Sequence, residues 1–92
     1  MAPRLTFRTH ALKRMFERRI TLGDVREVVE RGEVIEAYPD DMPRPSRLVL
    51  GTVGGRPFHV VVSDDGEGGT LVVVTVYEPE PARWTHGFRR RR

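Results

Sequence analysis

The spacing of the apolar residues changes at Gly32, and this change constrains the possible folds of the chain more than any other feature of the sequence. Before Gly32 they recur three to four residues apart, as on the buried side of a helix, and after it they alternate with polar residues in short segments. The first part therefore predicts two helices, over residues 9–19 and 21–31. The second part predicts four strands, which span residues 33–38, 46–53, 56–63 and 70–78.

Cap and turn residues support these boundaries. Thr9 is expected to cap the first helix and Thr21 the second, with Asp24 at the acidic position of a capping box. The glycine pair at 54–55 is a hairpin-turn signal between two of the strands. The strand over residues 70–78 is the most apolar, which is typical of a strand inside a sheet.

Together these elements predict an α+β domain, with an N-terminal helical hairpin packed on one face of an antiparallel sheet of four to five strands. The fifth strand would be the short alternating segment at residues 4–8. The opposite face of the sheet is expected to stay partly open and to hold a site. A chain of 92 residues builds one domain, which we assign to residues 1–88. Residues 89–92, four consecutive arginines, are expected to form a basic disordered tail.

The charge balance favours an anionic partner. Fifteen of the sixteen basic side chains are arginine, and the net charge is +3. A guanidinium group binds phosphate oxygens through two parallel hydrogen bonds. Codon usage in a G+C-rich genome would give the same excess without any function, and composition leaves both explanations open. No apolar run approaches the roughly 18 residues of a membrane span, and the N-terminus lacks the apolar core of a signal peptide. We therefore expect a cytoplasmic protein with no membrane partner.

One row of polar side chains marks the first predicted helix. His10, Arg14 and Arg18 recur every four residues, so they share one face of that helix. Leu12 and Phe16 are expected on its apolar side. The row is either a solvated helix face or a binding site for a phosphodiester, which the cations and the start of a helix both favour. In the second case the arginine would hold the anion while His10 exchanges a proton near neutral pH.

Polar side chains on the predicted strands supply further candidates for a site. On the open face of the sheet we expect Glu36, Tyr38 and Arg47, together with Tyr77 on the last strand. Leu48 and Leu50 alternate with Arg47 along the strand, so these two leucines would then face the helices.

The placement of His59 depends on the register of the hairpin that turns at residues 54–55. A two-residue turn pairs His59 with Leu50 and puts both on the helix side of the sheet. A one-residue bulge would move His59 to the open face, beside Tyr77. The sequence leaves these two placements open.

Metal-free RNA cleavage is the chemistry that these residue types allow. The three histidines lie far apart in the sequence and cysteine is absent, so we expect neither a metal site nor another cofactor. Cleavage by the 2′-hydroxyl group of RNA needs a base, an acid and cations near the phosphate. Histidine, glutamate and tyrosine exchange protons, and arginine holds the phosphate.

Four segments of the sequence carry a resemblance to a known family. They are "THALKRMFERRI", "EVIEAYPDDMPRPSRLVLG", "GRPFHVVV" and "VVTVYEPEPARW". The chain resembles a family of small bacterial proteins of unknown function, with an opening His-Ala-x-x-Arg-Met-x-Glu-Arg helix and a closing Thr-Val-Tyr strand. That family is commonly grouped with the RelE/ParE-like toxins of toxin–antitoxin modules.

The resemblance implies a RelE-like fold, cleavage of mRNA either free or on the ribosome, and an antitoxin partner, which in some members carries a zinc finger. In RelE-like ribonucleases, cations on the sheet and a tyrosine late in the last strand serve the phosphate, and Arg47 and Tyr77 match those places. His10 and Arg14 match the family's own helix motif. RelE-like toxins usually carry several lysines in the cleft, whereas this chain has one lysine, Lys13. ParE-like relatives poison gyrase and do not cleave RNA.

We therefore predict a toxin-like component of a toxin–antitoxin module, acting on mRNA as a metal-independent endoribonuclease. The expected catalytic residues are His10, Arg14, Arg47, His59 and Tyr77, and the expected substrate-binding residues are Arg18, Glu36 and Tyr38. The alternative is a non-catalytic RNA- or protein-binding module, for example a ParE-like inhibitor of a target protein. The expected partners of this monomer or weak dimer are RNA and the antitoxin.

Overall fold

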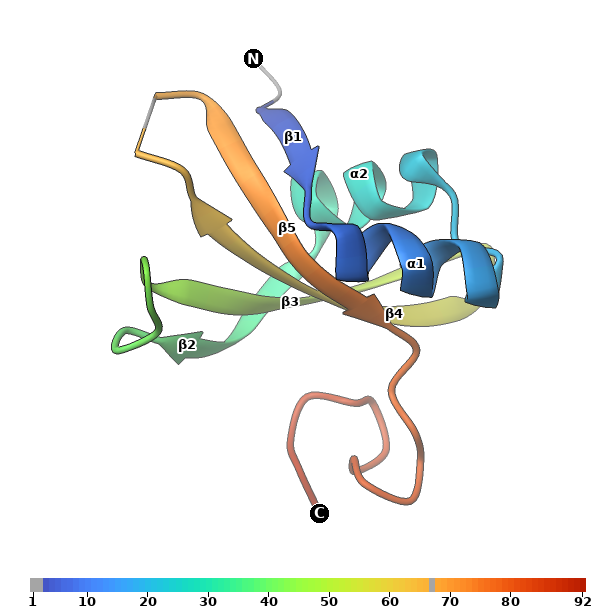
Figure 1. Cartoon of the computed structure of the whole chain (residues 1–92). Helices are drawn as coiled ribbons and strands as arrows, with labels where there is room; N and C mark the ends of the chain where they lie inside the picture. The colour runs from blue at the N-terminus through green and yellow to red at the C-terminus, as the bar shows by residue number, and fades with distance from the viewer. Residues whose placement is uncertain (1–2, 67) are drawn as a thin grey trace.

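Strand β1 precedes two helices, and the rest of the sheet follows them (Figure 1). The computed structural model describes residues 3–66 and 68–92. Its elements are β1 (Arg4–Phe7), α1 (Thr9–Arg18), α2 (Leu22–Arg31), β2 (Glu33–Tyr38), β3 (Ser46–Val53), β4 (Arg56–Asp64) and β5 (Thr70–Tyr77). The predicted α+β class and the predicted order of elements are confirmed.

The strands form one mixed sheet in the order β1-β5-β4-β3-β2. β2 to β5 run antiparallel, as expected, whereas β1 pairs with β5 in parallel, so the predicted antiparallel sheet is corrected to a mixed one. The two helices separate β1 from β2 in the chain, and this long connection lets β1 enter the sheet at the edge opposite β2. β5 lies inside the sheet, between β1 and β4.

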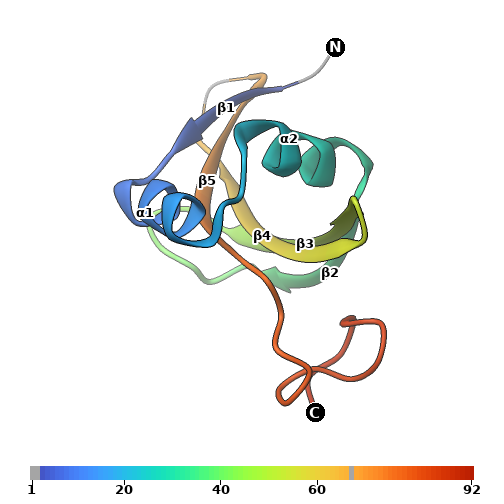
Figure 2. The same ribbon diagram turned by 90° about the vertical axis from the view of Figure 1, so that its right-hand side faces the viewer.

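Both helices lie on the same side of the sheet (Figure 2). α1 packs on β5, and α2 packs on β3 and β4. Within the described residues the contact between the two helices is minor, so the expected hairpin is not the packing unit. The buried residues that join the two layers are Ala11, Met15, Val25, Val28, Val49, Phe58, Val60, Val62, Val73 and Val76. Each helix is therefore held by the strands beneath it.

The residues of β3 that face the helices differ from the expected set. Val49 and Gly51 face the helices, so Leu48 and Leu50 lie on the opposite face. Gly51 explains this phase, because a Cβ atom at its position would lie 3.0 Å from a methyl group of Val28. A glycine at this position therefore lets α2 approach the strand closely.

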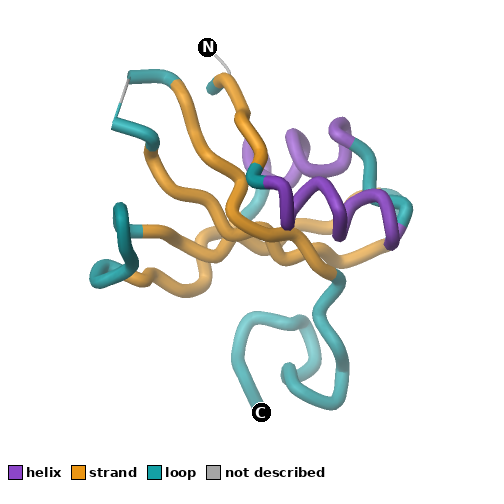
Figure 3. Tube along the Cα trace, viewed as in Figure 1, coloured by secondary structure: helices purple, strands orange, loops and turns teal. Residues whose placement is uncertain are grey.

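Residues 79–92, named here the C-terminal loop, lie against the sheet face that was expected to stay open (Figure 1; Figure 3). The loop closes on itself, because the backbone N–H of Thr85 donates to the carbonyl of Arg90 (2.8 Å) and that of Arg92 donates to Arg83 (2.8 Å). Trp84 is 3% exposed. The loop is therefore a folded part of the domain.

Two of the four arginines at the end of the chain, which the sequence predicted as a disordered tail, pair with the sheet in the structure. Arg89 pairs with Glu33 (Nε–Oε1, 2.9 Å), and Arg91 pairs with Glu36 (Nη2–Oε1, 3.2 Å). Both glutamates belong to β2. A run of like charges stays extended where nothing neutralises it. Here two acidic side chains of the sheet neutralise two of the arginines. The folded region therefore extends beyond residue 88.

Loss of the Thr21 cap is expected to lower the free energy of unfolding by about 1 kcal/mol. Thr21 Oγ1 accepts a hydrogen bond from the backbone N–H of Asp24 (3.0 Å), and the Asp24 carboxylate accepts one from the N–H of Thr21 (2.9 Å), which confirms the predicted capping box. Thr9 is instead the first residue of α1, and its N-cap, Arg8, makes no side-chain cap hydrogen bond. Urea unfolding should separate Thr21→Ala from the control Thr9→Ala. Equal effects of the two changes would contradict the assignment.

Candidate functional site

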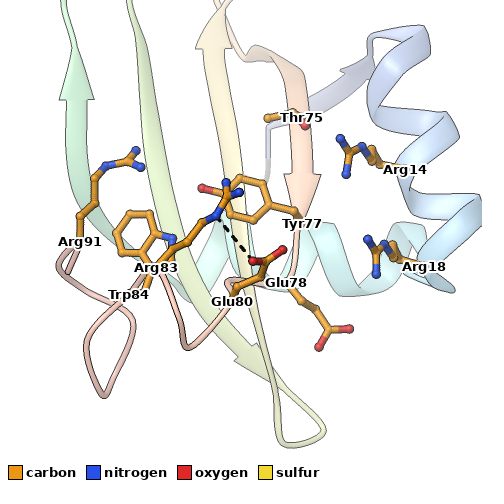
Figure 4. Close-up of a pocket in the computed structure, with 9 residues that line it drawn as sticks. All are labelled: Arg14, Arg18, Thr75, Tyr77, Glu78, Glu80, Arg83, Trp84 and Arg91. Atoms are coloured by element: carbon orange, nitrogen blue, oxygen red, sulfur yellow. Dashed lines mark ion pairs between the residues drawn. The ribbon is translucent and has the colours of Figure 1, made fainter.

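A pocket of about 400 Å³ lies between α1, the end of β5 and the C-terminal loop (Figure 4). Two lining residues come from α1, three come from β5 or the position just after it, and four come from the C-terminal loop. They are Arg14, Arg18, Thr75, Tyr77, Glu78, Glu80, Arg83, Trp84 and Arg91. The four arginines make the pocket a candidate site for an anion.

Two of the pocket arginines are unpaired. In the parts of the chain that the structure describes, the side chains of Arg14 and Arg18 make neither a hydrogen bond nor an ion pair. They lie one turn apart on α1 and share one side of the helix (Figure 4). Arg83 and Arg91 each pair with a glutamate. An anion can therefore bind Arg14 and Arg18 without breaking an existing pair.

His59 holds the Tyr77 hydroxyl group. His59 is 0% exposed, and its Nδ1 lies 3.2 Å from Tyr77 Oη while its Nε2 lies 2.9 Å from the carbonyl oxygen of Phe88. A carbonyl oxygen only accepts hydrogen bonds, so Nε2 carries the imidazole proton and Tyr77 donates to Nδ1. Burial lowers the pKa of His59 and raises the pKa of Tyr77. Both shifts keep the two groups neutral and leave the proton on Tyr77.

His59 lies on the side of the sheet away from the helices, but the reason differs from the one considered from the sequence. The hairpin has no bulge, because Leu50 pairs with His59. The two residues share one face of the sheet, and this face of β3 points away from the helices. Trp84 covers the imidazole edge-on, with 4.4 Å between the ring centroids. His59 does not line the pocket. It therefore positions Tyr77 and the C-terminal loop, and its expected catalytic role stays a prediction.

Glu36 and Tyr38, the expected substrate-binding residues of β2, do not line the pocket. The Tyr38 hydroxyl donates to the Glu36 carboxylate (2.5 Å), and Arg91 donates to the same oxygen (3.2 Å). Burial and the bond to Glu36 raise the pKa of Tyr38 to about 12. Burial by itself would raise the pKa of Glu36, but the hydrogen bonds from Tyr38 and Arg91 outweigh it and lower this pKa. The charged carboxylate therefore anchors Arg91 of the C-terminal loop.

Two of the expected catalytic residues also lie outside the pocket. His10 is exposed in the first turn of α1 and does not line the pocket, although Arg14 one turn later does. Arg47 pairs with the core residue Val62 across the sheet, so its side chain is on the helix face, opposite to Tyr77. The expectation for Arg47 failed because it assumed the opposite phase for β3.

The sequence reasoning missed the wall of the pocket that the C-terminal loop supplies. Glu80, Arg83, Trp84 and Arg91 all follow the last predicted strand, where prolines and the arginine run indicated a loop and a tail. The one available signal was Trp84, the single tryptophan of the chain. A large aromatic side chain rarely stays exposed in a small domain, so it indicates a packed segment.

The free energy of unfolding is expected to fall as the pH drops below 6.5, the ordinary pKa of histidine. Burial lowers the pKa of His59 in the folded protein, so in this window the unfolded chain takes up a proton that the folded chain does not bind. The free energy then falls with decreasing pH by at most about 1.4 kcal/mol per pH unit, until the lowered folded pKa is passed. Denaturant unfolding on both sides of pH 6.5 measures this slope.

A matched pair of variants assigns the slope to its residue. In His59→Gln the amide can still donate to Phe88 and accept from Tyr77, but it does not titrate, so the slope should disappear. His86→Gln changes an exposed histidine and should keep the wild-type slope. A wild-type slope in His59→Gln would show that another group is responsible.

Comparison with known proteins gives one family match. A family model described as "Domain of unknown function (DUF4258)" matches residues 7–78, whereas no curated protein and no solved structure matches the chain. The match includes Arg14, Arg18 and Tyr77, and the C-terminal loop lies outside it. Among the residues that the structure describes, no helix is long and apolar enough to cross a membrane. No group of three or more acidic or histidine side chains there is arranged to hold a metal ion.

Proposed function

The chain belongs to the family of domains of unknown function DUF4258, and we propose that it is a toxin-like protein that binds mRNA and cleaves it without a metal ion. The observation that carries this proposal is the group of Arg14, Arg18 and Tyr77 around one pocket. A RelE-like fold is part of the proposal. It is supported by the α+β architecture and by the tyrosine near the end of the last strand, beside the two cations.

The pocket suits one phosphodiester group of a single strand. Arg14 and Arg18 would hold the phosphate oxygens through charge-assisted hydrogen bonds, which are stronger than neutral ones. A cavity of about 400 Å³ is large enough for one nucleotide. The net charge of +3 draws RNA to the surface without choosing a sequence.

Cleavage of the strand requires two proton transfers. The 2′-hydroxyl oxygen attacks the adjacent phosphorus and loses its proton to a base, and the 5′-oxygen leaves with a proton from an acid. The products are a 2′,3′-cyclic phosphate and a 5′-hydroxyl end. Glu80 is our candidate base, since it is an exposed carboxylate of the pocket. Tyr77 is our candidate acid, while the two unpaired arginines stabilise the charge that develops on the phosphate.

Tyr77 holds a proton that it can donate to the leaving oxygen. Burial raises its pKa, so the hydroxyl keeps this proton near neutral pH but is a weaker acid than an exposed tyrosine. In the free protein this proton points to His59. Rotation about the C–O bond would turn it toward a substrate in the pocket that Tyr77 lines.

Binding of RNA without cleavage is the second candidate, and one observation favours it. Neither His10 nor His59 lines the pocket, so the pocket lacks the residue type most often used for proton transfer near neutral pH. A protein that binds RNA tightly and leaves it intact would support this candidate.

The proposed antitoxin partner has a candidate docking surface on α1. Met15 of this helix is buried, whereas Phe16 is 88% exposed and Leu12, one turn earlier, is 47% exposed. Lys13 lies three residues before Phe16 on the helix, and Arg19 follows as the exposed C-cap residue. This basic, apolar surface fits an acidic amphipathic segment of the antitoxin. Phe16→Ser should abolish its binding, and unchanged binding would rule the surface out.

Removal of either unpaired arginine is expected to weaken RNA binding. Arg14→Ala and Arg18→Ala should each raise the Kd for a single-stranded RNA about tenfold, since each removes one charge-assisted phosphate contact. Each should also reduce the slope of log K against log salt by about one phosphate contact. Arg4→Ala is the control, because Arg4 is exposed, as Arg18 is, but lies on β1 and not in the pocket. Equal losses in all three variants would mean that total charge matters and the pocket does not.

A further inference from the structure

Arg56 joins two walls of the pocket from outside it. This first residue of β4 donates hydrogen bonds to the backbone carbonyls of Arg18 (3.1 Å) and Arg19 (3.2 Å) at the end of α1. Its guanidinium also bonds the carboxylate of Glu78, just after β5, and lies 4.9 Å from the ring centroid of Phe58. All three guanidinium nitrogens are therefore engaged.

The bonds to α1 complete a helix end. The last carbonyl groups of a helix have no donor within the helix, and Arg19 ends this one in the left-handed conformation (φ 54°). Arg56 supplies donors for two of these carbonyls, and its positive charge complements the negative end of the helix dipole. It therefore fixes the turn that carries Arg18.

Glu78 is an acidic side chain that lines the same pocket as Arg18. A carboxylate is a natural partner of a free arginine. The Glu78 side chain points away from Tyr77 and from Arg14 (Figure 4), and the ion pair with Arg56 holds it there. Without Arg56 the carboxylate would be free to turn toward Arg18.

We propose that Arg56 is a positioning residue that keeps Arg18 available to an RNA phosphate. It does so by holding the Glu78 carboxylate aside and by fixing the last turn of α1. The inference rests on the proposed function, because it concerns the same pocket. It makes a distinct claim, which is that Glu78 inhibits binding once its partner is removed.

Four proteins test this claim through the Kd of a fluorescent single-stranded RNA oligonucleotide. They are the wild type, Arg56→Gln, Glu78→Gln and the double variant. Arg56→Gln should bind about tenfold more weakly, equivalent to one lost phosphate contact. Glu78→Gln removes an acidic side chain from the pocket and should bind RNA no more weakly than the wild type, and the double variant should regain most of the loss, because the competing carboxylate is gone. A merely structural role of Arg56 would give no such rescue.

A double variant as weak as Arg56→Gln would overturn the proposal, and so would wild-type binding by Arg56→Gln. If Arg56→Gln does not fold, Arg56→Lys gives the same comparison. Lysine keeps a positive charge but lacks the fork that reaches both α1 and Glu78, so binding should weaken about threefold and recover with Glu78→Gln. Arg14→Ala separates the two proposals. If Arg14→Ala binds RNA weakly and the Arg56 variants bind it as the wild type does, only the role of Arg56 is excluded. If the wild type does not bind RNA, both proposals are excluded.

Discussion

Phenylalanine at position 77 should slow RNA cleavage by about 10²-fold or more, the usual loss when a general acid is removed. Tyr77→Phe removes only the hydroxyl group, so the ring still lines the pocket beside Arg14 and Arg18. The Kd for RNA should therefore stay within about threefold of the wild type. Single-turnover cleavage rates at saturating protein, with Kd values measured in parallel, separate the chemical step from binding.

Tyr38→Phe is the matched control for this change. Tyr38 also donates its hydroxyl to a side chain beside the C-terminal loop, the Glu36 carboxylate, but it lies outside the pocket. Its loss should leave the cleavage rate close to that of the wild type. Equal slowing in both variants would indicate a disturbed C-terminal loop, and a wild-type rate in Tyr77→Phe would exclude the tyrosine as the acid.

Loss of the Trp84 side chain should lower the free energy of unfolding by about 3 kcal/mol or more, as for other buried aromatic residues. Trp84 is 3% exposed, contacts the His59 ring edge-on and lies beneath the guanidinium of Arg91. Trp84→Ala should also release the C-terminal loop and weaken RNA binding, because Arg83 and Arg91 leave the pocket with it. Urea unfolding followed by circular dichroism measures the first effect, and limited proteolysis after the exposed arginines measures the second.

Trp84→Phe separates anchoring from general destabilisation. A phenyl ring can still meet His59 edge-on, so this variant should keep the loop protected from protease and lose less stability. If the loop stays protected in Trp84→Ala, the ion pairs of Arg89 and Arg91 hold it. This result would contradict our account, because exposed ion pairs are expected to contribute little to the free energy of unfolding.

Sequence periodicity was sufficient to predict the helices and strands of this fold. It was not sufficient to predict which face of the sheet each residue occupies. The two helices and the strands β2 to β5 lie close to their predicted ranges. The phase of β3 depends on a contact between Gly51 and Val28, which are distant in sequence. A bulge between β4 and β5 shifts the alternation along β5 as well. Tertiary contacts of this kind leave no periodic signal in the chain.

The candidate site shows the same division. Arg14, Arg18 and Tyr77 were expected at a site and do line one pocket, because helical spacing and strand alternation are local properties. Arg47 was assigned to the wrong face of the sheet. The C-terminal loop was missed because its order depends on residues distant in sequence: Trp84 packs on His59 of β4, and the arginines at the chain end pair with β2, more than fifty residues earlier. The partners of a run of charged residues can be identified only once the fold is known.

The most direct test of the phosphodiester pocket is cleavage of a single-stranded RNA by the purified protein in the presence of EDTA. The products are best identified by mass spectrometry, for the wild type and for the Arg14→Ala/Arg18→Ala double variant. The wild type should yield fragments that end in a 2′,3′-cyclic phosphate, and the folded double variant should yield none. Intact RNA that remains unbound by the wild type, or equal cleavage by the double variant, would contradict the assignment of this pocket.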